Sequence, residues 1–404
     1  MSRNSGPDGR NVLFEPLQLP CGAVLKNRIA KSAMSDSLGD GTGHPTQAQC
    51  RLYRRWAEGG QALAIVGEVQ CGPGFAEKPG NLVLDGASDL DRFRDLARSG
   101  AANGALLWLQ LGHAGAMAYP PTSSPRGPSA LDLPGLTCAA LTLDEIRAVP
   151  LAFARTALLA KQSGFGGVQI HAAHGFLISQ FLSPLFNRRK DAYGGPVENR
   201  MRLLLEVIDA VREAVGAAFP VAVKLNSSDQ LEGGLNGDDA LEILAALDKT
   251  SIDLIDLSGG TYFPGAKSAS DSDGKGPYFI DFARRARGVT SKPLMVTGGF
   301  KTLAQAVTAV ASGHADVVGL ARLLALEPAL AGLWHAGRAA EPVFPRFTDP
   351  PEGGITAWYT MRLTQIGEDR ETPEYGDLEP AVAAYAARDR ERTATWLRHF
   401  AGPG

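Results

Sequence analysis

The stretch Val168–Arg200 reads VQIHAAHGFLISQFLSPLFNRRKDAYGGPVENR, and the fold of the chain can be worked out from it. The segment Gly166–Ile170 (GGVQI) overlaps the start of this stretch. Its apolar and β-branched residues, which follow two glycines, are typical of a buried parallel strand. The strand leads into two histidines, His171 and His174, with Gly175 behind them. In α/β barrels the loops after the strands converge on one open face and carry the chemistry. We therefore expect both imidazoles at such a face.

Strand-like and helix-like segments alternate about eight times along the chain, which is the number that a closed barrel requires. The expected strands are Arg28–Ala33, Ala62–Val69, Ala105–Leu111, Gly166–Ile170, Pro220–Leu225, Ile252–Leu257, Leu294–Thr297 and Asp316–Gly319. The expected helices are Gln47–Gly59, Leu90–Asn103, Thr142–Ser163, Asn199–Val215, Asp238–Lys249, Tyr278–Val289 and Leu303–Ser312. The prediction is an α/β fold, a (β/α)8 or TIM barrel. An open doubly wound sheet is the alternative that the pattern alone leaves open.

The segments outside this alternation predict additions to the barrel. Phe14–Lys26 suggests an N-terminal lid hairpin, and residues 1–335 are expected to form the barrel domain. Residues 336–404, with a helix from Leu378 to Phe400, are expected to form a C-terminal helical extension that packs on the barrel or on a partner subunit. Two connections, Gly112–Ala140 and Gly259–Gly276, are too long to be simple loops and are candidate lids or substrate loops.

Composition excludes several classes of protein. The 404 residues carry a net charge of −3, with 44% hydrophobic and 21% charged residues, and nothing in this balance suggests nucleic acid or an anionic membrane as a partner. The chain begins without an apolar leader and contains no apolar run long enough to cross a bilayer, so a cytoplasmic enzyme with a small-molecule substrate is expected. Four cysteines lack the spacing of a metal site or a disulfide framework: Cys21, Cys50, Cys71 and Cys138.

An ordered series of motifs between Phe14 and Leu330 resembles the old yellow enzyme family of FMN-dependent NAD(P)H oxidoreductases. Besides the opening stretch, the series contains NRIAKSAM (Asn27–Met34), RLYRRWAEGG (Arg51–Gly60), LWLQLGHAG (Leu107–Gly115), VKLN (Val223–Asn226), LIDLSGG (Leu254–Gly260) and PLMVTGGF…GHADVVGLARLLALEP (Pro293–Pro328). The resemblance implies FMN as cofactor, NAD(P)H as reductant and hydride transfer to an electron-poor alkene. It requires no separate Rossmann domain, and the sequence contains no GxGxxG fingerprint.

Residues after several strands match the family's contacts to FMN. Gly298 and Gly299 follow the seventh strand, and Ala321 and Arg322 follow the eighth, where barrels build a phosphate site. The resemblance assigns the remaining contacts to Ala33, Met34, Ser35, Gln110 and Lys224. It places Lys224 beside the N1/O2 edge of the flavin. Glu68 stands where relatives carry a small or amide residue near the pyrimidine ring; it either opposes flavin reduction, binds a cationic substrate or points away.

The resemblance assigns His171 and His174 to the electron-withdrawing oxygen of the substrate, where two imidazole donors polarise an enone. Phe176 departs from the family, because relatives usually have a tyrosine there that delivers a proton to the α-carbon, and phenylalanine has none to give. The candidate donors in its place are water, Tyr119, Tyr262 or a group of the substrate. Ser37 replaces a substrate-contacting tyrosine of some relatives, which predicts a wider or more polar pocket.

Three alternatives to an ene-reductase stay open on the sequence. Phe176 and Glu68 also fit a dehydrogenase or demethylase that oxidises its substrate. Lys224, in a valine-rich strand, also fits a flavin-free lyase that forms a Schiff base. The last alternative is a binding or scaffold barrel without catalysis.

Overall fold

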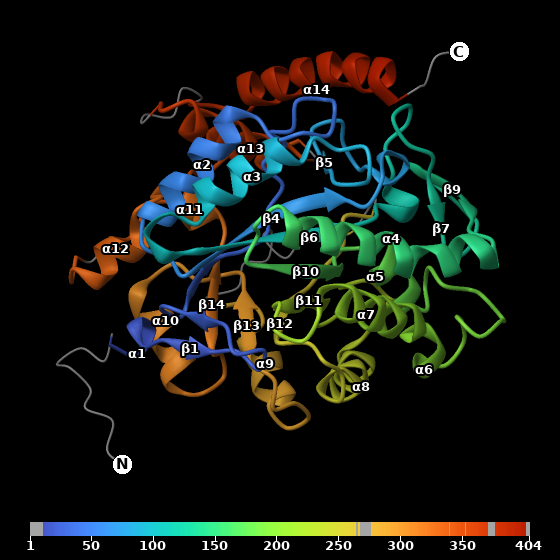
Figure 1. The fold of residues 1–404 in the computed structure, drawn as a ribbon, viewed down its shortest axis with the longest axis horizontal. Helices are drawn as coiled ribbons and strands as arrows, with labels where there is room; N and C mark the ends of the chain where they lie inside the picture. Colours follow the sequence, from blue (N-terminus) through green and yellow to red (C-terminus); the bar gives the residue numbers. More distant parts are fainter. Residues whose placement is uncertain are drawn as a thin grey trace.

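The computed structural model describes residues 11–263, 266, 276–338, 340–351, 353–370 and 376–400. Within them, eight parallel strands close into a barrel, because β3 pairs with β4 on one side and with β14 on the other. The barrel strands are β3 (Ile29–Lys31), β4 (Leu63–Gln70), β6 (Leu106–Gly112), β10 (Gly167–Ala172), β11 (Val221–Asn226), β12 (Leu254–Ser258), β13 (Leu294–Thr297) and β14 (Val317–Leu320). The predicted TIM barrel is confirmed, and the open sheet is wrong (Figure 1).

Helices follow the barrel strands along the chain and lie on the outside of the barrel, with α11 and α12 after the last strand (Figure 1). They are α2 (Gln47–Glu58), α3 (Leu90–Gly100), α4 (Leu143–Gln162), α5 (Leu177–Leu182), α6 (Val197–Arg200), α7 (Arg202–Val215), α8 (Gly237–Asp248), α9 (Ile280–Ala286), α10 (Leu303–Ala311), α11 (Arg322–Leu326) and α12 (Leu330–His335). Sequence capping signals set several starts: Thr142 and Glu145 form a reciprocal capping box at α4, and Thr302 and Gln305 form one at α10. None of the helices among the described residues is long and apolar enough to cross a membrane.

The barrel interior is layered. Its lower layer is apolar and combines side chains from seven strands: Ala30, Leu63, Ile65, Trp108, Ala222, Leu254, Met295 and Val317. The predicted lid hairpin is present as β1 (Leu17–Gln18) and β2 (Val24–Leu25). Leu19 and Leu25 of this hairpin belong to the same buried cluster, so the hairpin closes the barrel at that end. Polar side chains lie at the opposite end of the barrel, near the carboxyl ends of the strands.

The connection Gly112–Ala140 was expected to be a loop, and this was only partly right. It contains a short 3-10 turn, η3 (Gly115–Met117), and then a small sheet of β7 (Arg126–Gly127), β8 (Leu131–Leu133) and β9 (Leu136–Ala140), which we call the β7–β9 arm. The other expected long loop, Gly259–Gly276, lies largely outside the described residues.

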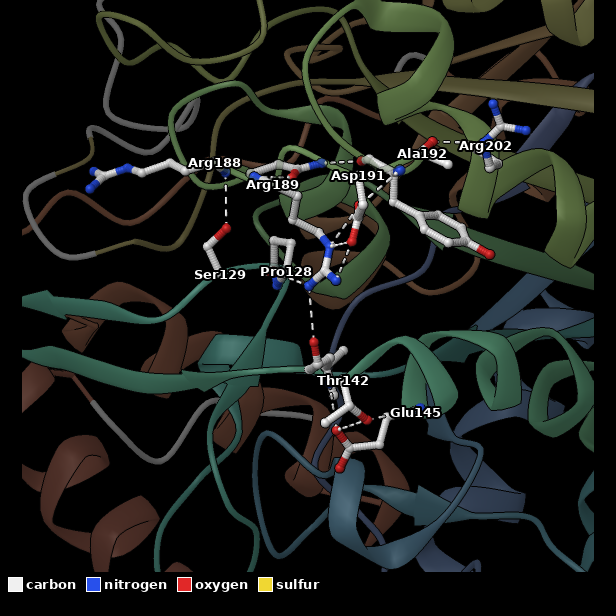
Figure 2. Close-up of polar contacts among 12 residues, drawn as sticks. Pro128, Ser129, Thr142, Glu145, Arg188, Arg189, Asp191, Ala192 and Arg202 are labelled. Atoms are coloured by element: carbon white, nitrogen blue, oxygen red, sulfur yellow. Dashed lines mark hydrogen bonds and ion pairs between the residues drawn. The ribbon is translucent and has the colours of Figure 1, made fainter.

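Arg189 fastens the β7–β9 arm to the barrel (Figure 2). Its guanidinium donates to the carbonyl oxygens of Pro128 at 2.8 Å and Leu141 at 2.9 Å, and it pairs with the carboxylate of Asp191 at 2.6 Å. The backbone N–H of Arg188 adds a bond of 2.9 Å to the hydroxyl of Ser129. The polar part of the opening stretch thus holds the arm beside the barrel mouth.

The C-terminal extension packs on the barrel of its own chain. Its helices are α13 (Gly354–Gly367), which contacts α2 and α11, and α14 (Leu378–Phe400), which lies across α13 (Figure 1). Trp396 of α14 is buried against Ala76 and Val83. Val83 belongs to the short strand β5 (Leu82–Val83), and Ala76 lies in the loop before it. The guanidinium of Arg392 donates to the carbonyl oxygen of Ser37. The extension therefore covers the loops that follow β3 and β4. The sequence did not predict α13.

Candidate active site

A hydrogen-bonded polar layer lies above the apolar layer of the barrel. The ammonium of Lys224 is 3.3 Å from the carboxylate of Asp256, and both side chains are almost completely buried. Asp256 also accepts bonds from the hydroxyl of Thr297 at 2.6 Å and from the amide of Gln169 at 3.1 Å. The amide of Gln110 donates in turn to Gln169 at 2.8 Å. Side-chain hydrogen bonds and one ion pair thus connect two predicted flavin contacts, Gln110 of β6 and Lys224 of β11. The connecting residues come from three other strands, β10, β12 and β13.

This network bears on the Schiff-base alternative. A lysine that forms a Schiff base must present a free amine to its substrate. Lys224 is instead held by a buried carboxylate that receives two further hydrogen bonds, and this arrangement suits a fixed positive charge. Asp256, Gln169 and Thr297 were missed by the sequence reasoning. Their signal was present, because each is a polar residue at an inward-facing position of an otherwise apolar strand.

The expected phosphate site has the features that an anion requires. Gly298 and Gly299 have φ of 116° and 80°, and a Cβ on Gly299 would lie 2.4 Å from the carbonyl oxygen of Gly276. Only glycine fits there, so the backbone after β13 is free to approach a ligand closely. Ala321 precedes α11, and the guanidinium of Arg322 lies 5.7 Å from the ring of Tyr359. Glycine backbone and one guanidinium fit the phosphate of FMN.

The loop after β3 supplies Ala33, Met34 and Ser35 at the same end of the barrel. It lies tightly against β4, since a Cβ on Gly67 would come within 2.6 Å of the carbonyl group of Met34. Ser37, which was expected to line a wider pocket, is only 3% exposed and has φ of 48°. Its carbonyl is held by Arg392, so α14 covers this side of the site.

His171 and His174 lie together at the end of β10. Nε2 of His171 is 3.2 Å from Nδ1 of His174, and Nε2 of His174 is 2.9 Å from the hydroxyl of Ser258. The backbone N–H of His174 donates to the side-chain oxygen of Asn226 at 3.1 Å, which fixes the residue at a φ of 62°. Burial lowers both pKa values well below the usual value; for His171 the neighbouring His174 and then the charge of Lys224 add to this effect, and for His174 the charge of Lys224 does. Both imidazoles are therefore neutral at pH 7.

Phe176 and Tyr262 border the histidine pair. The Phe176 ring centroid is 4.8 Å from that of His171, and the Tyr262 centroid is 5.6 Å from that of His174 and 6.1 Å from that of Phe176. Phe176 is 3% exposed and packs on Ala114 and Ala118. Tyr262 is therefore the candidate phenol that the fold brings close to Phe176. Tyr119 lies instead under the ammonium of Lys78, 4.7 Å from its ring centroid.

Glu68 sits on an irregularity of β4, where the register with β6 shifts between Val66 and Val69, and its φ is 60°. Its carboxylate accepts a bond of 3.1 Å from the side-chain amide of Asn81. The side-chain oxygen of Asn81 accepts the backbone N–H of Glu77 at 2.9 Å, which brings Glu77 next to Glu68. Sequence reasoning missed Glu77, since it lies in an irregular loop that carries no periodicity or motif.

Comparison with known proteins places the chain among flavin oxidoreductases. Residues 12–341 match the family described as the NADH:flavin oxidoreductase / NADH oxidase family. The chain is 36% identical over 353 residues to NADH-dependent flavin oxidoreductase iliE of Neonectria sp. (strain DH2), covering 78% of this chain and 46% of that relative. It is 33% identical over 405 residues to NADH-dependent flavin oxidoreductase nadA of Aspergillus parasiticus, covering 93% and 88%. The chain thus spans about half of the first relative and most of the second.

The fold comparison agrees. The structure of the old yellow enzyme homologue from Zymomonas mobilis matches with a TM-score of 0.72 at 25% identity, covering 86% of this chain and 98% of that one.

Proposed function

The chain belongs to the NADH:flavin oxidoreductase / NADH oxidase family, and on that premise we propose that it reduces electron-poor alkenes such as enones. FMN is the cofactor of this family and NAD(P)H its reductant. When bound, FMN would supply the hydride transfer from the nicotinamide to the second substrate. Both substrates would use the open face in turn, which gives ping-pong kinetics.

The observation that carries the proposal is the contact between His171 and His174. Their facing nitrogens lie 3.2 Å apart and both rings are neutral, so a carbonyl oxygen that enters between them would replace this mutual contact and accept an N–H from each ring. Negative charge grows on that oxygen when hydride reaches the β-carbon, and fixed donors stabilise it. Ser258 and Asn226 hold His174 in place for this role.

Lys224, Gln110 and the loop after β3 would hold the ring of FMN, and Gly298, Gly299 and Arg322 would hold its phosphate. The buried ammonium of Lys224 favours the anionic form of a reduced ring beside it. Asp256 holds the ammonium in position and is itself held by Gln169 and Thr297.

One anaerobic experiment tests the proposal. The visible flavin band of the purified protein is followed while NADPH or NADH is added, and then 2-cyclohexenone. We expect the band to bleach with the nicotinamide and to return with the enone. His171→Ala and His174→Ala should slow the return by about 100-fold or more, the cost of a lost oxyanion donor. Glu213→Gln, an exposed change on α7, serves as the matched control. No flavin band, even after FMN is added back, would contradict the proposal.

A second candidate function rests on Phe176, which offers an apolar ring where a proton donor would be expected. An enzyme that removes hydrogens from its substrate needs no such donor. In that case the band would bleach with the nicotinamide, stay bleached with the enone, and return only with oxygen.

A further inference from the structure

We propose that Glu77, paired with Glu68, is the acid that protonates the substrate carbon in place of the tyrosine that Phe176 replaces. The inference rests on the proposed function, because it supplies the proton for the second half of the same reaction. It assigns a catalytic role to a loop that follows β4 and that carries no recognisable motif.

The two carboxyl groups are held together by Asn81. Its amide nitrogen donates to Glu68 at 3.1 Å, while its side-chain oxygen accepts the backbone N–H of Glu77 at 2.9 Å and that of Lys78 at 3.0 Å. One asparagine therefore fixes both the Glu68 side chain and the Glu77 backbone. The left-handed φ of 60° at Glu68 is a strained conformation for a residue with a Cβ, and it turns this side chain out of the strand's ordinary alternation.

The pair is built to hold one proton. The Oε2 atom of Glu77 is buried and receives no hydrogen bond from any donor among the described residues, and Glu68 is 8% exposed. Two carboxylates that are linked through one asparagine and largely withdrawn from solvent ionise together only at a large cost, so a proton on Glu77 satisfies the otherwise unpartnered oxygen. Burial, then the charge of Glu68 and the hydrogen bond with it, raises the pKa of Glu77 well above its usual value.

Other titratable groups around the pair do not neutralise it in full. Lys78 lowers the pKa of Glu77, whereas Asp389 of α14 raises it. Three phenols also interact with one or both carboxyls: Tyr53 of α2, Tyr262 of the loop after β12 and Tyr385 of α14. Two arginines of α14, Arg388 and Arg392, interact with Asp389. A phenol is neutral at pH 7, so the pair keeps its proton in the range where the enzyme would work.

The pair lies on the same side of the mouth as Phe176. The ring of Phe75, two residues before Glu77, stacks on the ring of His113 with centroids 3.9 Å apart. The backbone carbonyl oxygen of Phe75 accepts the backbone N–H of Ala114 at 2.8 Å. Ala114 packs on Phe176. The backbone N–H of Tyr119 donates to the carbonyl oxygen of Ala76 at 3.0 Å, and Ala118, the residue before Tyr119, also packs on Phe176. The loop that carries Glu77 therefore lies against the segment that packs on Phe176.

The chemical step balances without a further reagent. Hydride delivered to the β-carbon brings two electrons, which leave an enolate whose oxygen is held by the histidine pair. The α-carbon of the enolate then forms a C–H bond with the proton of Glu77, and the electron pair of the broken O–H bond stays on the Glu77 carboxylate. The pair is then doubly negative until solvent returns one proton.

Glu77→Gln tests the role directly, since a glutamine amide can donate to Glu68 and preserves the fold of the loop. Reduction of the holoenzyme by NADPH should be unchanged. Reoxidation by 2-cyclohexenone should slow by about 100-fold or more, which is the usual contribution of a general acid. Reoxidation by ferricyanide, which needs no new C–H bond, should keep the wild-type rate. Equal rates with the enone in variant and wild type would overturn the inference.

The pH profile and an infrared spectrum separate an acid from a structural residue. The enone rate of the wild type should fall at high pH, as the pair loses its proton, and Glu68→Gln should move this limb to lower pH because the second negative charge is gone. The C=O band of a protonated carboxyl should be present in the oxidised wild type and absent in Glu77→Gln. A profile unchanged by Glu68→Gln contradicts the pairing.

Two outcomes distinguish this inference from the proposed function. If no enone reoxidises the wild type, the proposed function fails. If enones reoxidise the wild type and Tyr262→Phe is slow while Glu77→Gln is fast, the function stands and the acid is Tyr262 instead. Glu213→Gln is again the matched control.

Discussion

Lys224 and Asp256 form an ion pair of 3.3 Å in the barrel interior, with side-chain exposures of 1% and 0%. The two residues are direct neighbours in the register of β11 and β12. A buried carboxylate next to the lysine partly compensates its charge, so under the proposed function the pair would set how strongly the protein favours an anionic reduced ring.

Asp256→Asn removes that compensation. We expect the midpoint potential of bound FMN to rise, because an uncompensated ammonium favours the reduced anion. We also expect the free energy of unfolding to fall by about 3 kcal/mol, since a buried charge is left without its partner. Potentiometric titration and urea denaturation measure the two effects. Thr297→Val, which removes only the 2.6 Å hydrogen bond, should cost about 1 kcal/mol and move the potential less.

Arg322→Ala should weaken FMN binding. The guanidinium is the charged partner expected for the phosphate, and a hydrogen bond to a charged group contributes about 1.5–3 kcal/mol, so the dissociation constant should rise by about 10- to 100-fold. Flavin fluorescence on dilution gives the affinity. Arg284→Ala on α9, where the arginine side chain is 65% exposed, is the control. Unchanged affinity in Arg322→Ala would remove this residue from the phosphate site.

His113 makes stability depend on pH. Burial lowers its pKa from 6.5 to about 3, so between these values the unfolded state binds more protons than the folded state. The free energy of unfolding should therefore fall as the pH drops below 6.5, by about 1.4 kcal/mol per pH unit for this one group. Urea denaturation at several pH values gives the slope. In His113→Asn, whose amide oxygen can still accept the N–H of Gly115, the slope should be smaller by that amount.

Arg189→Ala should loosen the β7–β9 arm. The change removes bonds to Pro128 and Leu141 and leaves Asp191 without its partner, which should cost about 1–3 kcal/mol. Limited proteolysis should cut the arm faster than in the wild type. Arg188→Ala keeps the backbone bond to Ser129 and should behave like the wild type. Equal cleavage of both variants would show that the arm is held by other contacts.

The strands, the lid hairpin and most helices could be predicted, because each is encoded locally. Period-two and period-3.6 patterns, together with caps such as Thr142, depend on neighbours in the chain. Helix ends were less certain: the expected helix Leu90–Asn103 ends at Gly100, and Asn103 adopts φ of 52°. The extension was harder to predict, since α13 is buried over nearly its whole length and lacks an amphipathic pattern.

The sequence by itself determined the barrel and the family, and it placed the histidine pair, the glycine pair and Arg322 at strand ends. Short-range periodicity and motif order carry that information. Only the tertiary structure decided that Asp256 would pair with Lys224, that Arg392 would hold the carbonyl of Ser37, and that Asn81 would link Glu77 to Glu68. These partners are joined by strand register, by helix packing and by an irregular loop. These residues come together only when the barrel closes, and no local sequence pattern indicates which residues will then be neighbours.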